Sequence, residues 1–479
     1  MAGTIVEQLA AFTFDTRYAD IPSETVEETK RILLDSIGCA FAATDTPKGR
    51  IGMEIAGMIG GAGEATILGA DARASVFGAA FANGELINAL DFDSILPPGH
   101  VSPYVIPGAL ALAEVGRAPG RELVVAIAVA HEISNRIGKA MDYLRDMREG
   151  RMATPTVYGY SSTIFGAAAA AMRVKGLDAG RMAHGLGIAG CIAPINSHMA
   201  WVRHTPSTTI KYTVAGVLAQ SALTAAAMGE LGHRGDLAVL NDAEYGFPAM
   251  IGTKRWECGR ITEELGRSWG FARESSLKPY PHCRVLHSVF DAMIELLETN
   301  HILAAEIERI EAWGEAFVDL PIWQNERIED VVDAQFSLKH GIALAAQRVK
   351  PGKAWQDPKL VFSPEVIGMM GKVHHHPHPE YLSRLAADPA SRPARVKICA
   401  RGKVFVAERL YPKGSPSPDA TSRMTNDEVI AKFLHNAEGV LASHAAEAAV
   451  EAVLTLEKAP DVGRVMALFG PSVGLRKAS

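Results

Sequence analysis

Apolar residues recur every three or four positions through residues 1–268, and this spacing predicts one helix after another. Ser23 is expected to cap the N-terminus of one of them, because apolar residues follow it at helical spacing. Gly120–Met141 repeats the same pattern, and Gly166–Arg173 is dominated by alanine, the strongest helix former. The first half of the chain is therefore expected to be all-helical.

The pattern changes after Gly270. Ile307–Asp319 and Ala394–Leu410 contain alternating β-branched residues, which predict strands, and Arg401-Gly402-Lys403 in the second segment is a hairpin turn signal. Between them, Ala334–Arg348 has a helical pattern. This pattern predicts that residues of about 270–412 form a smaller α+β unit.

A linker rich in proline, glycine and serine follows at Pro412–Ala420, and Thr425 or Asn426 can then cap a helical run to about Leu468. These last helices are expected to pack on the first ones, because an isolated pair would leave its apolar face exposed. The predicted fold class is mainly α. Residues 1–268 and 413–479 would form a large all-helical domain, and residues 269–412 a smaller α+β domain inserted between them.

Composition and charge narrow the class of protein. The chain of 479 residues is 48% apolar and 21% charged, as expected of a globular protein, and its net charge is −6. Because no block rich in lysine and arginine occurs, we expect no nucleic-acid partner, and an anionic ligand would have to be held by local cations.

Three weakly charged stretches are long enough to be checked as membrane spans: Thr156–Met172, Ala183–Val202 and Tyr212–Gly229. All three contain polar side chains and are rich in alanine and glycine, so we interpret them as buried helices and expect no membrane partner. The N-terminal residues lack the basic and apolar regions of a secretory signal.

The cysteines do not suggest a metal site or disulfides. They are odd in number, far apart and without a CxxC pair: Cys39, Cys191, Cys258, Cys283 and Cys399. This pattern fits a reducing compartment, and we expect a cytoplasmic protein. We also expect no metal at the tract Val373–Pro379 (VHHHPHP), because functional sites draw ligands from a scaffold that holds them apart. The run Gly60–Gly63 lacks the spacing of a phosphate loop and is interpreted as a turn.

The densest group of chemically useful residues lies in Asn83–Pro103. A helical pattern leads into Asp91 and Asp93, a loop with two prolines delivers His100, and a new helix begins near Pro103. Two carboxylates and a histidine at such a junction suit acid–base chemistry, because a rigid scaffold positions loop residues. The alternative is that the aspartates cap helix ends and that His100 is an ordinary loop residue.

Two further segments carry cations. Met199–Gly216 contains Arg203, His204 and Lys211 among apolar residues, and a buried Lys211 would need a partner such as a substrate carboxylate or a core aspartate.

Leu277–His287 places four basic residues around two prolines at the predicted domain boundary: Lys278, His282, Arg284 and His287. Cations between domains suit an anionic ligand, and the alternative is a set of solvated charges at a helix start.

Ordered blocks along nearly the whole chain resemble the MmgE/PrpD superfamily, which includes 2-methylcitrate dehydratase, cis-aconitate decarboxylase and iminodisuccinate epimerase. The blocks are GEATILG (63–69), NGELINALDFDS (83–94), HVSPYVIPGALALAE (100–114), GRELVVAIAVAHEISNRIG (120–138), FGAAAAAMRVKGLD (165–178), HGLGIAG (184–190), LKPYPHCRVLHS (277–288) and AQFSLKHGIALA (334–345).

The resemblance implies a helical domain built from both chain ends, with an inserted α+β lid and the active site between them. It further implies a homodimer, a small polycarboxylate substrate and no cofactor or metal. The family's catalytic residues carry over to Asp91, His100, Lys211 and Lys278.

Two departures from the family pattern bear on specificity. Ile95 stands where the family often has a threonine, and the loop to His100 is one residue short. The region Thr156–Tyr160 lacks the histidine of a GFH block, and Val157, Tyr158 or Tyr160 takes its place. The fold expectation is unaffected, whereas the substrate is expected to differ.

These residues predict proton transfer beside a carboxylate. Lys211 and Lys278 would neutralise the developing enediolate, and a lysine of lowered pKa would act as the base. Asp91 would restrain a lysine or His100, and His100 would protonate a carbanion or a departing hydroxyl.

Substrate carboxylates and hydroxyls would contact six further residues: Asp93, Tyr158, Arg203, His204, His282 and Arg284. Tyr160 is the candidate for an acid on the opposite face of the substrate.

Four functions compete. The preferred one is a hydro-lyase that dehydrates a hydroxy-polycarboxylate. The alternatives are an epimerase of a dicarboxylate, which the tyrosines and the missing histidine favour, a decarboxylase of the cis-aconitate type, and a non-catalytic anion-binding protein.

Overall fold

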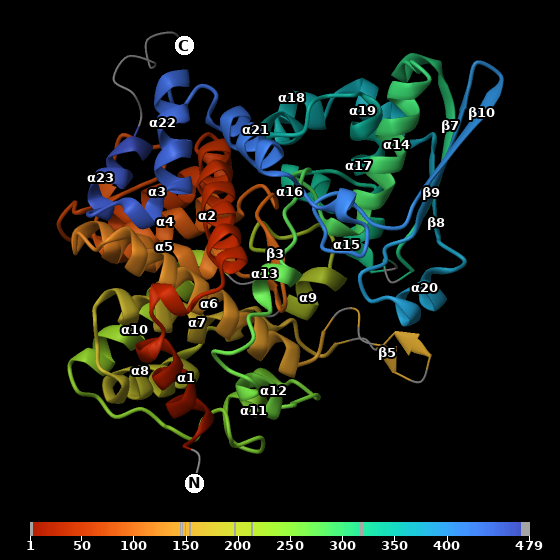
Figure 1. The fold of residues 1–479 in the computed structure, drawn as a ribbon. Helices are drawn as coiled ribbons and strands as arrows, with labels where there is room; N and C mark the ends of the chain where they lie inside the picture. Colours follow the sequence, from red (N-terminus) through yellow and green to blue (C-terminus); the bar gives the residue numbers. More distant parts are fainter. Residues whose placement is uncertain are drawn as a thin grey trace.

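The computed structural model describes residues 3–470 except 144, 146, 149, 153–154, 196–197, 212–213, 317 and 319, and it also leaves out the side chains of Arg148 and His198. The described chain is mainly helical, with one four-stranded sheet at one side of the molecule (Figure 1). The predicted mainly-α class is confirmed, whereas the insertion of residues 269–412 as a lid domain stays a prediction.

The longer helices are α1 (Ile5–Asp15), α2 (Ser23–Ala43), α3 (Pro47–Ile59), α4 (Val76–Asn88), α5 (Ser102–Val115), α6 (Gly120–Ala140), α7 (Thr163–Val174), α8 (Ala179–Ile192), α10 (Ala215–Glu230), α14 (His287–Thr299), α17 (Leu338–Ala346), α21 (Asn426–Ala437) and α22 (Ser443–Leu454). The shorter ones are α9 (His198–Arg203), α11 (Phe247–Ile251), α12 (Gly259–Thr262), α13 (Phe271–Glu274), α15 (Pro321–Gln324), α16 (Val331–Ala334), α18 (Pro358–Val361), α19 (Pro364–Met370), α20 (Tyr381–Ala387) and α23 (Val462–Met466).

The helix boundaries follow the predicted pattern with one correction. Of the two predicted capping residues, Thr425 and Asn426, Thr425 is the one that caps α21, and it forms a capping box with Glu428. Ser23, by contrast, is the first residue of α2 and its side chain does not cap it. Pro22 precedes the helix instead, and its carbonyl accepts from the amides of Thr25 and Val26. Proline suits this place because its φ of −56° leads into the first turn.

The sheet has the strand order β10-β9-β7-β8 and is formed by β7 (Ile307–Gly314), β8 (Val373–Pro377), β9 (Ala394–Ala400) and β10 (Lys403–Arg409). The predicted hairpin joins β9 to β10, and Arg401 and Gly402 turn it with φ of 54° and 65°. Two-residue strands form three further ribbons: β1 (Ala65–Thr66) with β2 (Arg73–Ala74), β3 (Ile95–Leu96) with β4 (Gly99–His100), and β5 (Met147–Arg148) with β6 (Arg151–Met152).

The histidine tract is an ordinary strand, which the sequence did not predict. Val373–Pro377 runs parallel to β7, with His375 opposite Ala312 and His376 bonded to Glu311 at 2.7 Å. Within the described residues, no group of three or more His, Cys, Asp or Glu side chains is placed to hold a metal ion. The tract therefore has a structural explanation as part of the sheet.

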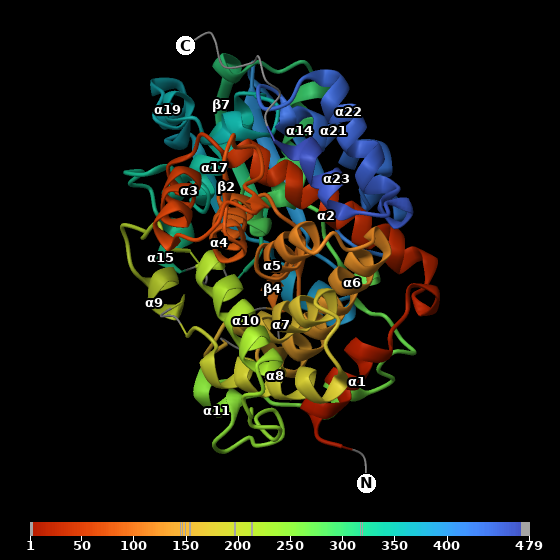
Figure 2. The ribbon, with the colours of Figure 1, turned by 90° about the vertical axis from the view of Figure 1, so that its left-hand side faces the viewer.

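The two ends of the chain pack together. Helices α21 and α22 lie against α2, and α23 lies against α5 (Figures 1 and 2). On the other side, α14 covers strands β7, β9 and β10, and α17 packs on β8. In β9 the residues Ala394, Val396, Ile398 and Ala400 are buried and alternate with half-buried ones, as a sheet covered on one face requires.

The weakly charged stretches contain the largely buried helices α7, α8 and α10, and no helix in the described part of the chain combines the length and apolarity needed to cross a bilayer. All five cysteines are unpaired.

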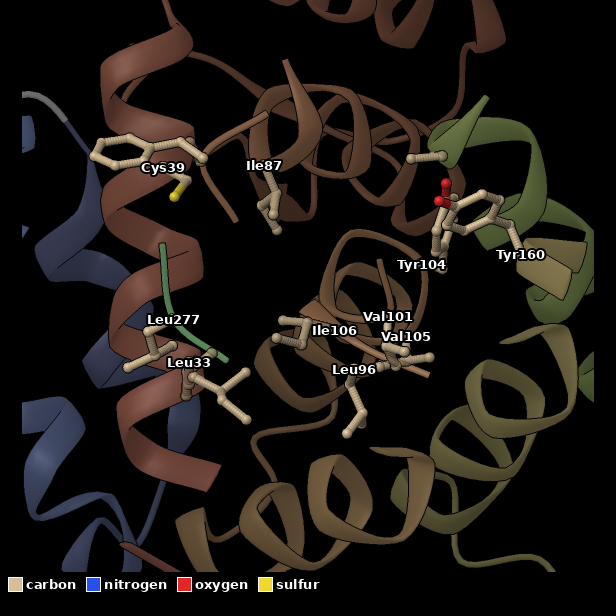
Figure 3. Close-up of a cluster of buried hydrophobic side chains, with 14 of the residues drawn as sticks. Leu33, Cys39, Ile87, Leu96, Val101, Tyr104, Val105, Ile106, Tyr160 and Leu277 are labelled. Atoms are coloured by element: carbon tan, nitrogen blue, oxygen red, sulfur yellow. The ribbon is translucent and has the colours of Figure 1, made fainter. Parts of the chain in front are cut away.

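The loop between α4 and α5 is anchored in the core by its own apolar residues. Leu96 and Val101 are buried beside Val105 and Ile106 of α5 (Figure 3). The loop backbone also rests on α6, because Gly138 has no side chain to separate them. A Cβ atom at position 138 would lie 2.4 Å from the amide nitrogen of Pro98.

Replacing Gly138 by alanine is therefore expected to push the Pro97–Gly99 backbone away from α6. We expect a loss of about 1–3 kcal/mol in the free energy of unfolding, measured by urea denaturation, because overpacked sites relax only partially. Gly57→Ala in α3 is the control, since a Cβ there meets nothing within 4 Å. It should leave stability unchanged or raise it by up to about 1 kcal/mol. Equal stability of the two variants would contradict the tight contact.

Candidate acid–base site

Asp91 lies at the centre of the site, in the loop that follows α4. Its side chain is fully buried, and its φ of 54° falls in the left-handed region that few residues other than glycine adopt. Aspartate tolerates this conformation better than most residues do. The turn directs the carboxylate away from solvent, so the charge has to be balanced inside the protein.

Two buried lysines share the Asp91 carboxylate. The Nζ of Lys278 lies 2.6 Å from Oδ2 and also donates to the Asp91 carbonyl oxygen at 2.8 Å. The Nζ of Lys211 lies 3.3 Å from Oδ1. Lys211 and Lys278 are 1% and 0% exposed. Lysines separated by 67 positions in the chain, one after α9 and one before α14, thus meet at one carboxylate.

Burial and the neighbouring charges shift the pKa values in opposite ways. Burial raises the pKa of Asp91, but the charges of Lys278 and Lys211 outweigh burial and hold this pKa well below its usual range. Burial lowers the pKa of Lys211 to about 7, although the Asp91 charge acts in the other direction. Lys211 can therefore gain or lose a proton near neutral pH, while Asp91 stays ionised.

His100 stands between two carboxylates. Its Nδ1 lies 2.7 Å from Oδ2 of Asp93, and its Nε2 lies 3.5 Å from Oδ1 of Asp91. The short contact to Asp93 fixes the orientation of the ring, and each ring nitrogen has a carboxylate nearby. This arrangement suits a group that delivers a proton, and it places Asp93 as a positioning residue.

A pair of glutamines orients Lys211. Gln335 accepts from the lysine Nζ at 2.9 Å and donates to the carbonyl of Ala89 at 3.0 Å and to the amide oxygen of Gln356. Gln356 donates in turn to the carbonyls of Leu90 and Pro281, each at 2.9 Å. The glutamines thereby connect the Asp91 turn to the segment that carries Lys278.

The C-terminal helices also support the turn. Lys432 of α21 donates to the carbonyl of Phe92 at 2.8 Å and to Asp35 of α2 at 2.6 Å, and its ammonium lies 3.7 Å from the centroid of the Phe92 ring. Helices from both chain ends therefore hold the loop of Asp91 and Asp93.

A cavity of about 90 Å³ adjoins these residues. His100 and Lys278 form part of its wall, while Asp91, Asp93 and Lys211 lie behind them. The remaining wall residues are Ile95, Pro98, Gly99, Tyr143, Arg145, Tyr158, Tyr160, Trp201, Val202, Cys283, Arg284, Val285, Trp323, Phe336 and Arg392. Of the residues in the Asp91 cluster, His100 and Lys278 are thus the ones that border the cavity.

Tyr158 and Tyr160 both line this cavity. Burial raises the pKa of each phenol, so both stay protonated and can donate a hydrogen bond. The ring of Tyr160 lies beside Tyr104 (Figure 3) and 6.1 Å from the His100 ring, measured between centroids. Ile95 supplies an apolar wall at the position where the family often has threonine.

Three other predicted residues do not line the cavity. Arg203 and His204 are exposed, at the end of α9 and just after it. His282 is buried behind the wall, packs edge-on against Phe290, and has its pKa lowered to about 4 by burial. A role for these three in binding substrate stays a prediction.

Several wall residues escaped the sequence analysis. Arg145 and Arg392 lie outside every quoted block, and no local pattern marks them. Gln335, which is bonded to Lys211 behind the wall, also escaped it; this residue belongs to the block AQFSLKHGIALA, and a polar residue there among apolar neighbours was the available signal. Arg284 was predicted and does line the cavity.

The site combines a buried carboxylate, two lysines and a histidine beside a cavity. Two family models cover most of the sequence: residues 7–258 match the MmgE/PrpD N-terminal domain, and residues 280–458 match the MmgE/PrpD C-terminal domain. The chain belongs to the MmgE/PrpD family.

The similar proteins include one human protein and two fungal ones. Human cis-aconitate decarboxylase is 30% identical over 256 residues, which cover 52% of this chain and 51% of the human protein. The cis-aconitate decarboxylase-like protein oryM of Aspergillus oryzae is 23% identical over 98% of this chain and 97% of its own length. Cis-aconitate decarboxylase of Aspergillus terreus is 25% identical over 58% of this chain and 57% of its own length. The chain thus matches about half the length of the human and A. terreus proteins.

Lys211→Met is expected to change how stability depends on pH. Because the pKa of Lys211 is about 7 when folded and about 10.4 in an unfolded chain, the unfolded state binds more protons between these values. Raising the pH from 7 to 9 should therefore stabilise the native protein relative to the variant, by up to about 1.4 kcal/mol per pH unit.

Urea unfolding at several pH values measures this difference, and the exposed Lys403→Met is the control that should follow the native curve. Parallel curves for the native protein and Lys211→Met would show that Lys211 has an ordinary pKa.

Proposed function

We propose that this protein is a lyase that acts on a small polycarboxylate by moving a proton at a carbon beside a carboxylate. The observation that carries the proposal is that His100, held between two carboxylates, and Lys278 share one wall of the cavity. A cation and a proton donor side by side are what the unstable enediolate of such a reaction requires.

Each residue of the cluster then has a role. Lys278 stabilises negative charge on the reacting carboxylate, and His100 delivers the proton. Asp93 and Asp91 position the imidazole and the lysine. Lys211, whose pKa is about 7, takes up or releases a proton behind Asp91 at neutral pH. Residues 269–412, which contribute Arg284, Phe336 and Arg392 to the wall, act as the lid that excludes water.

Dehydration is one reaction that this arrangement supports. A C–H bond beside a carboxylate breaks and His100 takes its proton, the C–O bond to a hydroxyl breaks as a C=C bond forms, and His100 returns the proton to the departing hydroxyl so that water leaves. The cluster supplies both the acid and the cation for these steps without a bound metal, and activity should persist after treatment with EDTA.

Decarboxylation is the second candidate, supported by the names of the similar proteins. The bond between a carbon and its carboxylate breaks, CO₂ leaves, and His100 protonates the resulting carbanion. Epimerisation would require an acid on each face of the carbon, and Tyr158 and Tyr160 are the candidates for the second face.

Incubation with candidate hydroxy- and unsaturated polycarboxylates in D₂O, followed by NMR, tests the proposed reaction. Dehydration should give a new alkene, with deuterium entering the remaining substrate by reversal of proton removal. Decarboxylation should release CO₂ and place deuterium on the product carbanion. Inversion of configuration without loss of water or CO₂ would establish an epimerase instead. Binding of these acids without any exchange would overturn catalysis and leave an anion-binding protein.

His100→Gln is expected to lower turnover by about 10²–10⁴-fold, because the glutamine keeps the size of the side chain but cannot deliver a proton. Asp93→Asn should give a smaller loss, since His100 stays in place with a weaker partner. His233→Gln, at an exposed position, is the control and should match the native protein. Native turnover by folded His100→Gln would remove His100 from the mechanism.

A further inference from the structure

A second charged cluster lies in the wall of the same cavity, in residues that the proposed mechanism does not use. Glu315, just after β7, is bonded to the guanidinium of Arg392 and lies 3.8 Å from the Nε of Arg145. Tyr381 of α20 also donates to Glu315, at 2.9 Å. The side chains of Glu315, Arg145 and Arg392 are 2%, 9% and 14% exposed.

The two arginines of this cluster differ in the number of hydrogen bonds that their guanidinium groups make within the protein. Arg145 donates to the carbonyl of Pro389 at 2.8 Å, to the carbonyl of Ser391, and to the hydroxyl of Tyr381, so each of its three guanidinium nitrogens makes a hydrogen bond within the protein. It ties the segment after α6 to the residues before β9. The side chain of Arg392 has one hydrogen-bond partner among the described residues, Glu315, and Arg392 lines the cavity.

Arg284 borders the same cavity and has no acidic partner in the described structure. Its Nη1 donates to the Nδ1 of His287 at 2.9 Å and to the carbonyl of Lys413 at 3.0 Å, and its Nη2 donates to the hydroxyl of Ser415. Its Nε is buried without a hydrogen-bond partner, in a residue that is 4% exposed. A buried, unsatisfied donor on a cation is costly unless a ligand completes it.

The charges of this side of the cavity do not balance. Arg145 and Arg392 share the single carboxylate of Glu315. Arg284 has no carboxylate within ion-pair distance among the described residues, although the charge of Asp291 lies near it. On the side of His100 and Lys278, both lysines pair with Asp91, and His100 pairs with Asp93. The arginine side, where guanidinium groups outnumber directly paired carboxylates, is therefore the place for the anionic groups of a ligand that do not react.

We propose that Arg284 and Arg392 bind the non-reacting carboxylates of the substrate, and that Glu315 occupies Arg392 until the substrate displaces it. Arg145 is a positioning residue that fixes Glu315 and Arg392 relative to the rest of the wall. This assignment rests on the proposed function and adds the residues that set substrate specificity.

The assignment has a consequence for the charge of the preferred ligand. One carboxylate lies at Lys278, where the reaction takes place, and two lie on the arginine side. A dicarboxylate would use Lys278 and Arg284 and would leave Arg392 bonded to Glu315. Arg392 therefore distinguishes ligands by their third carboxylate.

Propane-1,2,3-tricarboxylate and glutarate form a matched pair of probes, since they differ only by the carboxylate on the central carbon. Isothermal titration calorimetry of the full chain should show that Arg392→Gln weakens binding of the tricarboxylate by roughly 10–100-fold, the worth of a charge-assisted hydrogen bond. Binding of glutarate should change by less than about threefold, because the dicarboxylate does not use Arg392. Arg395→Gln is the control, since its side chain is exposed and pairs with Glu408.

Glu315→Gln is expected to change the affinity for the tricarboxylate in the opposite direction to Arg392→Gln. This difference separates a binding role of Arg392 from a structural one. Glu315→Gln removes the competing charge while keeping the shape of the side chain, so the tricarboxylate should bind at least as tightly as in the native protein. Equal weakening of both probes in Arg392→Gln, or weakening of the tricarboxylate in both variants, would overturn the assignment.

The same measurements distinguish this inference from the proposed function. Binding of the tricarboxylate that depends on Arg392, with no turnover of any polycarboxylate, would refute the lyase and leave the arginine subsite standing. Turnover of a tricarboxylate with a KM that Arg392→Gln does not change would refute the subsite and leave the lyase standing.

Discussion

The buried carboxylate of Asp91, shared by Lys278 and Lys211, is the interaction on which the rest of the site depends. An ion inside a protein is stable only with partners that replace its hydration, and removing one partner of a buried pair costs about 3–5 kcal/mol. Here one carboxylate stabilises two ammonium groups. Lys211, which lies farther from the carboxylate than Lys278 does, has its pKa lowered to about 7 by burial. Charge balance in the core and proton availability in the site are therefore set by the same three residues.

This interaction requires contacts from both chain ends and from the middle. Lys432 from α21 and Asp35 from α2 hold the loop after Asp91, and the glutamines at 335 and 356 hold its beginning. The packing of the C-terminal helices on α2 is thus a condition for the site as well as for the core. Small residues serve the same purpose, since Gly138 allows the backbone that leads to His100 to rest directly on α6.

The cavity is electrically asymmetric. In its reactive wall, His100 pairs with Asp93 and Lys278 pairs with Asp91. On the arginine side, Arg145 and Arg392 share the one carboxylate of Glu315, which suits the fixed negative charges of a polycarboxylate. Under the proposed function, the two regions divide the work between chemistry and recognition.

The sequence by itself determined the helical class, the β9–β10 hairpin, the family, and the residue types of Asp91, His100, Lys211 and Lys278. These depend on local periodicity, turn chemistry and ordered motifs, which are readable one segment at a time. Only the tertiary structure decided that Lys211 lies behind the cavity wall, that Arg203 and His204 are exposed, and that Arg145, Arg392 and Glu315 meet. Arg145 and Arg392 are 247 positions apart in the chain, and a contact over that distance is made by packing rather than by any local pattern.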